Sequence, residues 1–231
     1  MGKVTTAYLL TCAAIGVATG LLIIPATAFS TATYATMPPV SAIVAGAWVI
    51  GFVVAMRLLE RPGAALLTGL ISGLVATPLS TTGAAIVVTN VMFAAFIELP
   101  FLVTLYRRWS RWLYLVGATL LAAFYSVWTV TAADMQAFQG WVVALYVVVL
   151  FASELGAVAL GLVIADRLRA LSPQATLDRG YAIAHLDGGV IVRDAAQAEP
   201  GAKVVVTVAR GSFAARSDGE VAESEHPDAQ P

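Results

Sequence analysis

The sequence predicts an all-α polytopic membrane protein with six transmembrane helices and both termini in the cytoplasm. A small β module and a disordered acidic tail are predicted to follow. Three observations support this. The chain is strongly apolar up to Ala165 and ordinarily charged after it. Its apolar segments are long enough to cross a bilayer. Its basic residues lie at only one side of the resulting bundle.

Charge is scarce in the first part of the chain. Of the 231 residues, 59% are hydrophobic and 12% are charged, and the mean hydropathy is +0.85. Soluble domains carry about 25% charged residues. The acidic residues before Leu162 are Glu60, Glu98, Asp134 and Glu154. This composition predicts an integral membrane protein with a polar tail.

Six apolar segments approach the length of about 20 residues that a bilayer core requires. The third is short and rich in glycine, so a re-entrant hairpin is an alternative for it. The segments are 7–29, 40–58, 62–79, 84–106, 113–130 and 141–165.

The basic residues determine the predicted orientation. Lys3 precedes the first segment, and the others follow the second, fourth and sixth segments, while the remaining connections contain none. Cytoplasmic loops carry an excess of Lys and Arg, so both termini are predicted to be cytoplasmic. The other basic residues up to position 170 are Arg57, Arg61, Arg107, Arg108, Arg111, Arg167 and Arg169.

The first segment has a second interpretation. Lys3, the apolar run and Ala26-Thr27-Ala28 have the order of a signal peptide and its cleavage site. The run is about 20 residues long, however, whereas signal peptides have about 7–15. A retained helix is therefore favoured.

The polar tail is predicted to contain two parts. The runs YAIAHL, GGVIV, KVVVTV and SFAAR alternate with turns, which indicates a small β unit over residues 171–216. Residues 217–231 are acidic and poor in aromatic residues, which is typical of disorder. The membrane domain is assigned to residues 1–170.

The chain contains none of the motifs that would indicate an enzyme. It has no Walker A sequence, zinc-ligand spacing or nucleophile elbow. Both histidines, His185 and His226, lie in the tail, and the single cysteine, Cys12, lies in an apolar run. We therefore predict no catalytic residues, metal site or cofactor, and any energy for transport must come from an ion gradient or a partner.

Two carboxylates lie inside predicted membrane helices, where ionisable residues are costly and usually functional. Glu98 is near the cytoplasmic end of the fourth segment and within reach of Arg107, Arg108 or Arg57. Glu154 is near the middle of the sixth segment without a basic residue at its depth. Both ligand contact and an interhelical hydrogen bond are open for Glu154.

Polar and aromatic residues converge at the predicted outer side, where an interfacial aromatic belt is the alternative explanation. Such a set would suit a flat, nitrogen-rich ligand, because aromatic rings can stack on it and polar groups can bind its edge. The set comprises Tyr34, Asn90, Tyr125, Trp128, Asp134, Gln136, Gln139 and Trp141. The predicted ligand-binding residues are Glu154, Asn90, Trp128, Trp141, Tyr125 and Asp134.

Small residues in the first segment predict a helix-packing face. Ala14 and Ala18 are four residues apart, which allows another membrane helix to approach closely. Cys12, Gly16 and Gly20 form an adjoining stripe.

Residues 1–170 resemble the YkoE family of substrate-binding (S) subunits of energy-coupling factor (ECF) transporters. The resemblance rests on AGAWVIGFVVAMRLLERPGAALLTGLISGLVATPL and IELPFLVTLYRRWSRW. It implies six helices, thiamine or hydroxymethylpyrimidine as ligand, and docking through Ala14 and Ala18. The implied partners are a transmembrane coupling subunit and two ATPase subunits in a bacterial plasma membrane. Residues 77–83 depart from the family, which often carries Asn and Trp there.

The tail is similar to the C-terminal end of the exodeoxyribonuclease VII large subunit, through Leu171-Ser-Pro, Ala175-Thr-Leu and Arg179-Gly-Tyr-Ala-Ile. The nucleic-acid-binding and catalytic parts of that enzyme have no counterpart in this chain. The resemblance implies a small β module, whose expected role is either protein contact or stabilisation of the cytoplasmic end, and no nucleic-acid partner is expected.

The leading hypothesis is the S subunit of an ECF transporter that imports a vitamin or precursor. One alternative is a membrane adaptor acting through its β module. Another is a proton-coupled carrier with Glu98 and Glu154 as proton sites.

Overall fold

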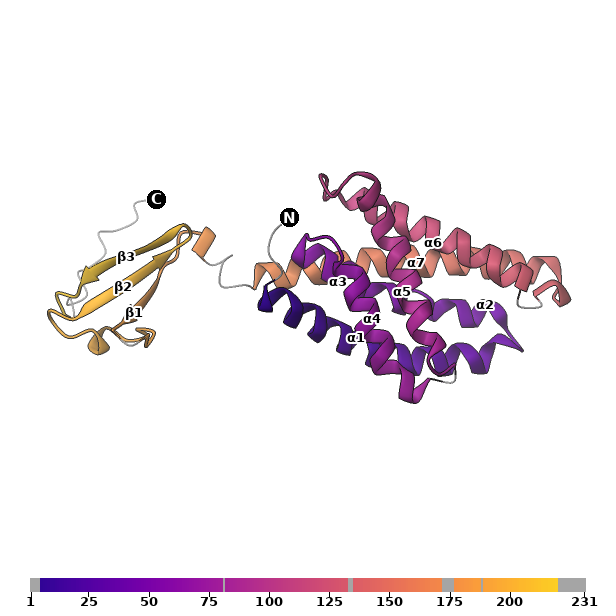
Figure 1. The fold of residues 1–231 in the computed structure, drawn as a ribbon, viewed down its shortest axis with the longest axis horizontal. Coiled ribbons are helices and arrows are strands. Elements are labelled where there is room, and N and C mark those ends of the chain that lie inside the picture. Colours follow the sequence, from indigo (N-terminus) through magenta and orange to yellow (C-terminus); the bar gives the residue numbers. More distant parts are fainter. Residues whose placement is uncertain (1–4, 81, 133–134, 172–176, 188, 220–231) are drawn as a thin grey trace, which may run out of the picture. The chain divides into compact units, whose positions relative to one another are not determined.

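The computed structural model describes residues 5–80, 82–132, 135–171, 177–187 and 189–219. The chain forms two compact units, Met1–Arg167 and Leu168–Pro231, and each is described separately. The predicted division at residues 170 and 216 stays a prediction. The elements (Figure 1) are α1 (Thr6–Tyr34), α2 (Pro38–Ser41), η1 (Ala42–Val44), α3 (Ala47–Leu59), α4 (Ala64–Ala76), η2 (Thr77–Leu79), α5 (Ala85–Val103), α6 (Arg111–Ala132), η3 (Met135–Ala137), α7 (Gly140–Ala170), β1 (Ile183–Leu186), η4 (Ala195–Gln197), β2 (Lys203–Val208) and β3 (Gly211–Arg216).

Helices occupy all six segments that the sequence marks as apolar, which confirms a mostly helical membrane protein. Within the described residues, five helical spans are long and apolar enough to cross a bilayer. The orientation of the termini stays a prediction. The five spans are Thr6–Tyr34, Pro38–Leu59 (α2, η1 and α3 together), Ala85–Val103, Arg111–Ala132 and Gly140–Ala170.

The third segment is shorter than the other five, so the prediction that it crosses the membrane as a sixth transmembrane helix stays a prediction. This segment forms one shorter apolar helix, Ala64–Leu79, made of α4 and η2. At 1.5 Å per residue it is about 24 Å long, less than the hydrocarbon core of about 30 Å. Gly63 begins it with a φ of 79°, and Pro78 lies in its last turn. It is a single helix, so the re-entrant hairpin is not formed.

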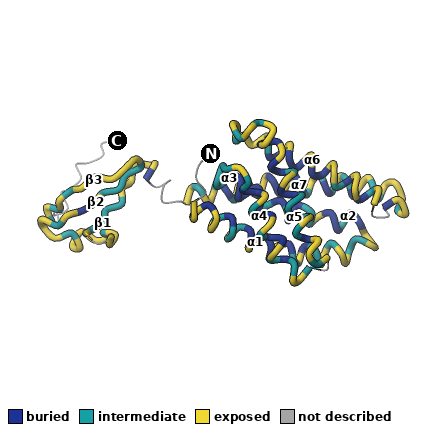
Figure 2. Tube along the Cα trace, viewed as in Figure 1, coloured by how far each residue is buried: buried dark blue, intermediate teal, exposed yellow. Residues whose placement is uncertain are grey.

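Helix α3 lies at the centre of the first unit. Its residues Gly51–Met56 are all buried, as is Val49. Such a helix is apolar all round because it is surrounded by other helices. By contrast, α1, α6 and α7 each have one buried stripe and expose leucine and valine side chains elsewhere (Figure 2). These exposed apolar side chains are suited to contact lipid.

Glycine permits a close contact between α3 and α7. The Gly46 N–H donates to Ser153 Oγ at 2.9 Å, and this hydroxyl donates to the Ile43 carbonyl at 2.7 Å. A Cβ atom added at Gly46 would lie 2.5 Å from Ala157 Cβ. The absence of a side chain at Gly46 therefore brings the two helices together, as small residues do in membranes.

An ion-pair network joins three helices at the arginine-rich end of the bundle. Asp166 of α7 accepts from Arg57 of α3 at 3.2 Å and from Arg111 of α6 at 2.8 Å. Arg57 also pairs with Glu60 at 3.2 Å. Arg57 therefore forms ion pairs with both Asp166 and Glu60.

The Glu98 carboxylate holds the beginning of α4. It accepts hydrogen bonds from the backbone N–H groups of Gly63 and, at 3.3 Å, Leu66. The Tyr106 hydroxyl donates to it at 2.8 Å. The expectation that Glu98 pairs with a nearby arginine is thus corrected: the free N–H groups at a helix start and its positive dipole end attract a carboxylate. Glu98 is 3% exposed.

The turn after α5 presents Tyr106 to this carboxylate. Leu105 and Tyr106 adopt left-handed φ values of 51° and 55°, so α5 ends at Val103, before the predicted end at Tyr106. The Tyr106 N–H donates to the Phe101 carbonyl at 2.8 Å, a bond that closes many helix C-termini. Burial and the hydrogen bond to Glu98 raise the pKa of the Tyr106 phenol, so it stays protonated as a donor.

The second unit contains an antiparallel sheet in the order β1-β2-β3. The Ala209-Arg210 turn joins β2 and β3, with Val208 opposite Gly211. Three of the four predicted β runs form these strands, while GGVIV contributes the isolated bridge between Ile191 and His185. A small sheet at the C-terminal end of the chain is thereby confirmed. Most of the predicted acidic tail, residues 220–231, lies outside the described residues.

Replacing Glu98 should destabilise the membrane unit. In Glu98→Ala, the Gly63 and Leu66 N–H groups lose their buried acceptor, which should cost about 3 kcal/mol. Thermal unfolding in detergent, followed by circular dichroism, measures the loss. Glu60→Ala removes a more exposed carboxylate from the same end and should lower the melting temperature much less. Equal melting temperatures for the two variants would contradict the capping role.

Two glycines should respond oppositely to alanine. Gly46→Ala places a methyl group against α7 and should destabilise the protein by about 2 kcal/mol. Gly156 has open space around its added Cβ, so Gly156→Ala should stabilise α7 by up to about 1 kcal/mol. The same unfolding measurement compares them. A Gly46→Ala protein as stable as the parent would show that α3 and α7 do not require this close approach.

Candidate ligand-binding site

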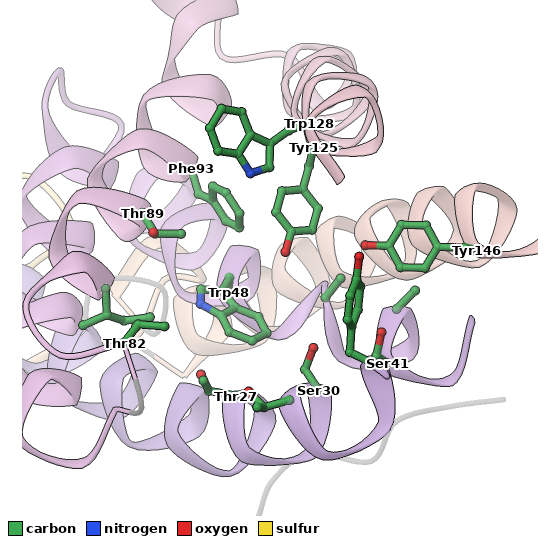
Figure 3. A pocket seen from close by; sticks show the side chains of 15 residues that line it. Thr27, Ser30, Ser41, Trp48, Thr82, Thr89, Phe93, Tyr125, Trp128 and Tyr146 are labelled. Carbon is green, nitrogen blue, oxygen red and sulfur yellow. The ribbon is translucent and has the colours of Figure 1, made fainter. Parts of the chain in front are cut away.

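A cavity lies at the end of the bundle opposite the arginine-rich end. Its volume is about 300 Å³, within the lower range of small-molecule sites. It is formed where α1 and α6 end and where α3, α5 and α7 begin (Figure 3). The lining residues are Thr27, Ser30, Thr31, Tyr34, Ser41, Ala42, Ala45, Trp48, Thr82, Ile86, Thr89, Phe93, Tyr125, Trp128 and Tyr146.

Aromatic side chains from five helices surround this cavity. They are Trp48 of α3, Phe93 of α5, Tyr125 and Trp128 of α6, Tyr146 of α7 (Figure 3) and Tyr34 of α1. Phe93 and Tyr125 pack edge to face, with ring centroids 5.4 Å apart. Such a wall supports flat rings by stacking and cations through ring faces.

Three hydroxyl groups of the cavity are arranged as acceptors. Thr27, Ser41 and Thr89 donate their hydroxyl protons to carbonyls of the preceding helical turn, at 2.9, 2.7 and 3.2 Å respectively. A hydroxyl has one proton and two lone pairs, so the lone pairs of these oxygens stay available. The cavity is therefore better suited to a ligand that carries N–H groups or positive charge.

One lining side chain supplies a donor. Trp48 Nε1 is buried without a hydrogen-bond partner among the described residues. A buried donor of this kind is costly unless a ligand or water accepts from it. It can therefore orient one acceptor atom of a bound molecule.

Two of the predicted ligand-binding residues line the cavity, namely Tyr125 and Trp128. Of the other predicted convergent residues, Tyr34 also lines it. Tyr34, Tyr125 and Trp128, which were predicted to lie close together, thus line one cavity. The predicted location of that cavity on the outer side stays a prediction.

Glu154 and Asn90 lie outside the lining. Both are buried, with 1% and 0% exposure. The Asn90 Nδ2 donates to Ser72 Oγ at 3.1 Å and joins α5 to α4. One Glu154 oxygen, Oε2, has no partner among the described residues. Asn90 thus makes an interhelical contact, while Glu154 remains unpaired at Oε2.

Trp141 is not brought into the cavity. It is 66% exposed, and its Nε1 donates to Gln139 at 2.5 Å, a position typical of an interfacial aromatic residue. Asp134 lies outside the described residues, so its predicted role in ligand binding stays a prediction.

The two stripes of α1 face different surroundings. Cys12, Gly16 and Gly20 are buried, and Gly16 and Gly20 pack closely against α4. Ala14 and Ala18 are exposed. This leaves the predicted docking residues available on the outside of the unit.

Several lining residues were missed by sequence reasoning. Trp48 appears in the sequence analysis only within a stretch that resembles the YkoE family. The other residues that were not predicted include Phe93, Ser30, Ser41, Thr27, Thr31, Thr82 and Thr89. The usable signal was the hydroxyl-rich end of the first segment, Ala26–Tyr34, which contains Thr27, Ser30, Thr31 and Thr33. Thr27, Ser30 and Thr31 recur at the i, i+3, i+4 spacing that places them on one side of the helix.

The described cavity does not offer a set of metal ligands. None of the fifteen lining residues is His, Cys, Asp or Glu, the side chains that bind first-row metal ions. The described residues likewise contain no group of three such side chains that could hold an ion.

Comparison with known families agrees with this architecture. Residues 8–125, just over half of the chain, match the family described as the permease component of ABC-type cobalt transport systems. The chain belongs to this family. Membership makes it a multi-pass membrane component of a transport system, without an enzymatic role of its own.

A solved structure shares the fold of the membrane unit. It is described as an S-component of an ECF transporter, and its TM-score is 0.66 at 19% identity. The match covers 77% of this chain and 95% of the other. The permease-component family and the S-component fold therefore occur together in this chain.

Short matches to another protein cover a small part of the chain. The exodeoxyribonuclease 7 large subunit of Acidothermus cellulolyticus is 44% identical over 62 residues, 26% of this chain. That of Leifsonia xyli is 51% identical over 49 residues, 21% of this chain. The chain spans 15% and 11% of these relatives' lengths. The similarity is therefore confined to a short segment of these enzymes.

Proposed function

We propose that this chain is the substrate-binding subunit of an ECF transporter and binds thiamine or its hydroxymethylpyrimidine precursor. The observation that carries the proposal is the aromatic, acceptor-rich cavity inside an S-component fold. Aminopyrimidine is flat, donates through its amino group and accepts through its ring nitrogens. The Trp48, Tyr125 and Trp128 rings can stack on it, and the Thr27, Ser41 and Thr89 oxygens can accept from it.

An organic ligand agrees better with the cavity than a cobalt ion does. Cobalt(II) prefers imidazole, thiolate and carboxylate ligands, and the described lining has none of them. Within the family we therefore propose a YkoE-type member that takes an organic cargo. Glu154 is proposed to act from outside the cavity lining, and Asn90, Trp141 and Asp134 to contribute indirectly.

The proposed partners are a transmembrane coupling subunit and two ATPase subunits, because this chain has no nucleotide-binding motif of its own. We propose a bacterial plasma-membrane location with the cavity outside and the C-terminal tail in the cytoplasm. The seven arginines of the membrane domain, which follow its second, fourth and sixth predicted segments, support this orientation. The exposed Ala14 and Ala18 are proposed to contact the coupling subunit.

The coupling-factor function is preferred to a proton-coupled carrier with two proton sites. Glu98 accepts three hydrogen bonds at the start of α4, so both of its oxygens hold the beginning of that helix. This structural role speaks against Glu98 as one of the two proton sites that a carrier would use.

Removing an aromatic wall should weaken ligand binding. Trp48→Ala is expected to lower the affinity for thiamine or hydroxymethylpyrimidine at least about tenfold, the effect of losing a stacked ring worth about 1.4 kcal/mol. Isothermal titration of the detergent-solubilised protein measures both ligands. Trp112→Ala is the control, because Trp112 is 74% exposed at the opposite end. The cavity assignment fails if the two variants bind equally well.

Bulky residues on the docking face should impair assembly. Ala14→Trp and Ala18→Trp are expected to reduce copurification with the coupling subunit severalfold, because close helix contact requires small side chains. Ligand binding by the isolated subunit should persist. Ala123→Trp, at an exposed position of α6, is the matched control. Unchanged copurification of both α1 variants would place the docking surface elsewhere.

A further inference from the structure

Glu154 is a carboxyl group in an unusual position. It is 1% exposed near the middle of α7, and Oε2 has no hydrogen-bond partner among the described residues. An isolated carboxylate in a low-dielectric interior costs so much free energy that the group takes up a proton instead. The geometry therefore requires either a proton or a neighbouring cation at Glu154.

Glu154 lies on the same buried face of α7 as a residue that lines the cavity. Tyr146, Leu150 and Glu154 are four residues apart and all buried, so they share the inward face of α7. Tyr146 lines the cavity and contacts Thr129 of α6 at 3.5 Å. The Glu154 charge also acts on the hydroxyls of Tyr125 and Tyr146, two members of the cavity wall.

No described basic residue neutralises this carboxylate. The charged group of α3 is Arg57, which pairs with Asp166 and Glu60 at the opposite end. Helix α5 carries Glu98, which is held by the start of α4. On α6 the basic residue is Arg111, which also binds Asp166.

The remaining titratable neighbours are uncharged. Tyr125 of α6 and Tyr146 of α7 are close enough for the Glu154 charge to act on them, while Tyr8 and Cys12 of α1 lie at the arginine-rich end of the bundle and Tyr34 at the cavity end. The described residues around Glu154 thus contain no fixed counter-charge. Only something that enters the cavity can supply one.

The cavity itself is suited to a positive ligand. Trp48, Phe93 and Tyr125 present ring surfaces, and the Thr27, Ser41 and Thr89 oxygens have lone pairs available, as described above. Ring faces and oxygen lone pairs both attract cations. Glu154 would add a full negative charge to this set.

We propose that Glu154 binds a proton while the cavity is empty and releases it when a cationic organic ligand enters, so that one ligand exchanges for one proton. This inference rests on the proposed function and adds that pH regulates ligand binding. In the exchange, the O–H bond of the carboxylic acid breaks, its proton passes to water through the cavity, and the carboxylate stays as counter-ion to the ligand. Charge is conserved, because one positive charge leaves as another enters.

The exchange makes affinity depend on pH in one direction. At acid pH the ligand must displace the proton, so thiamine should bind up to about tenfold more weakly for each unit of pH below the titration range of Glu154. Hydroxymethylpyrimidine lacks the fixed positive charge of thiamine and should show a much smaller dependence. The two ligands form a matched pair.

Calorimetry tests the exchange directly. Thiamine is titrated into the full chain between about pH 5.5 and about pH 8, in two buffers with different heats of ionisation, to count protons released. About one proton per thiamine is expected on the acid side, and none for Glu154→Gln, which should still bind hydroxymethylpyrimidine. Glu60→Gln should behave as the parent protein.

Infrared spectroscopy supplies a test without ligand. The spectrum of the parent minus that of Glu154→Gln should show the carbonyl band of a protonated carboxylic acid at neutral pH, which thiamine should abolish. Absence of this band, or thiamine binding without pH and buffer dependence, overturns the proton exchange while the proposed function stands. Failure of both ligands to bind the parent protein overturns the proposed function and the exchange together.

Discussion

The membrane unit depends on how the short helix α4 is begun. A helix start has four N–H groups without intrahelical partners, and in an apolar environment each must be satisfied by protein. From α5, Glu98 accepts hydrogen bonds from two N–H groups at this start, those of Gly63 and Leu66. The Tyr106 hydroxyl, in the turn after α5, donates to the same carboxylate. Three distant pieces of chain are thereby joined, namely the turn before α4, the body of α5 and the loop after it. The left-handed turn at Leu105 and Tyr106 is the conformation that brings the phenol to this position.

Much of the fold could be predicted because bilayer thickness dictates helix length. Segments 84–106 and 113–130 correspond to α5 and α6 within a few residues, because the length of an apolar run and the positions of arginines can be read directly from the sequence. The shortness of α4 was harder to judge, because its apolar run includes Pro62 and Gly63, which begin the turn and not the helix. The end of α5 depends on backbone angles at Leu105 that hydropathy does not encode.

The candidate site was predicted only in outline for a similar reason. Tyr125 and Trp128 were found because topology placed the end of their segment outside. Asn90 was assigned to the ligand by residue type, but it lies on the face of α5 that packs on α4, where Ser72 binds its amide. Which face of a uniformly apolar helix turns inward depends on small residues such as Gly46 and Gly69, whose neighbours are not visible before the helices are packed. The hydroxyls of the cavity were overlooked because threonine and serine are tolerated in any membrane helix.

The length of α4 has a consequence for the bilayer around it. A helix of this length in a thicker bilayer creates a hydrophobic mismatch, which other proteins relieve by thinning the bilayer or by tilting. Irregular backbone at membrane depth is tolerated where it lines a cavity, and Thr82, from the connection after η2, is among the lining residues. The connection that follows the short helix thus supplies part of the cavity wall, so the position at which this helix ends determines which residues a ligand can meet.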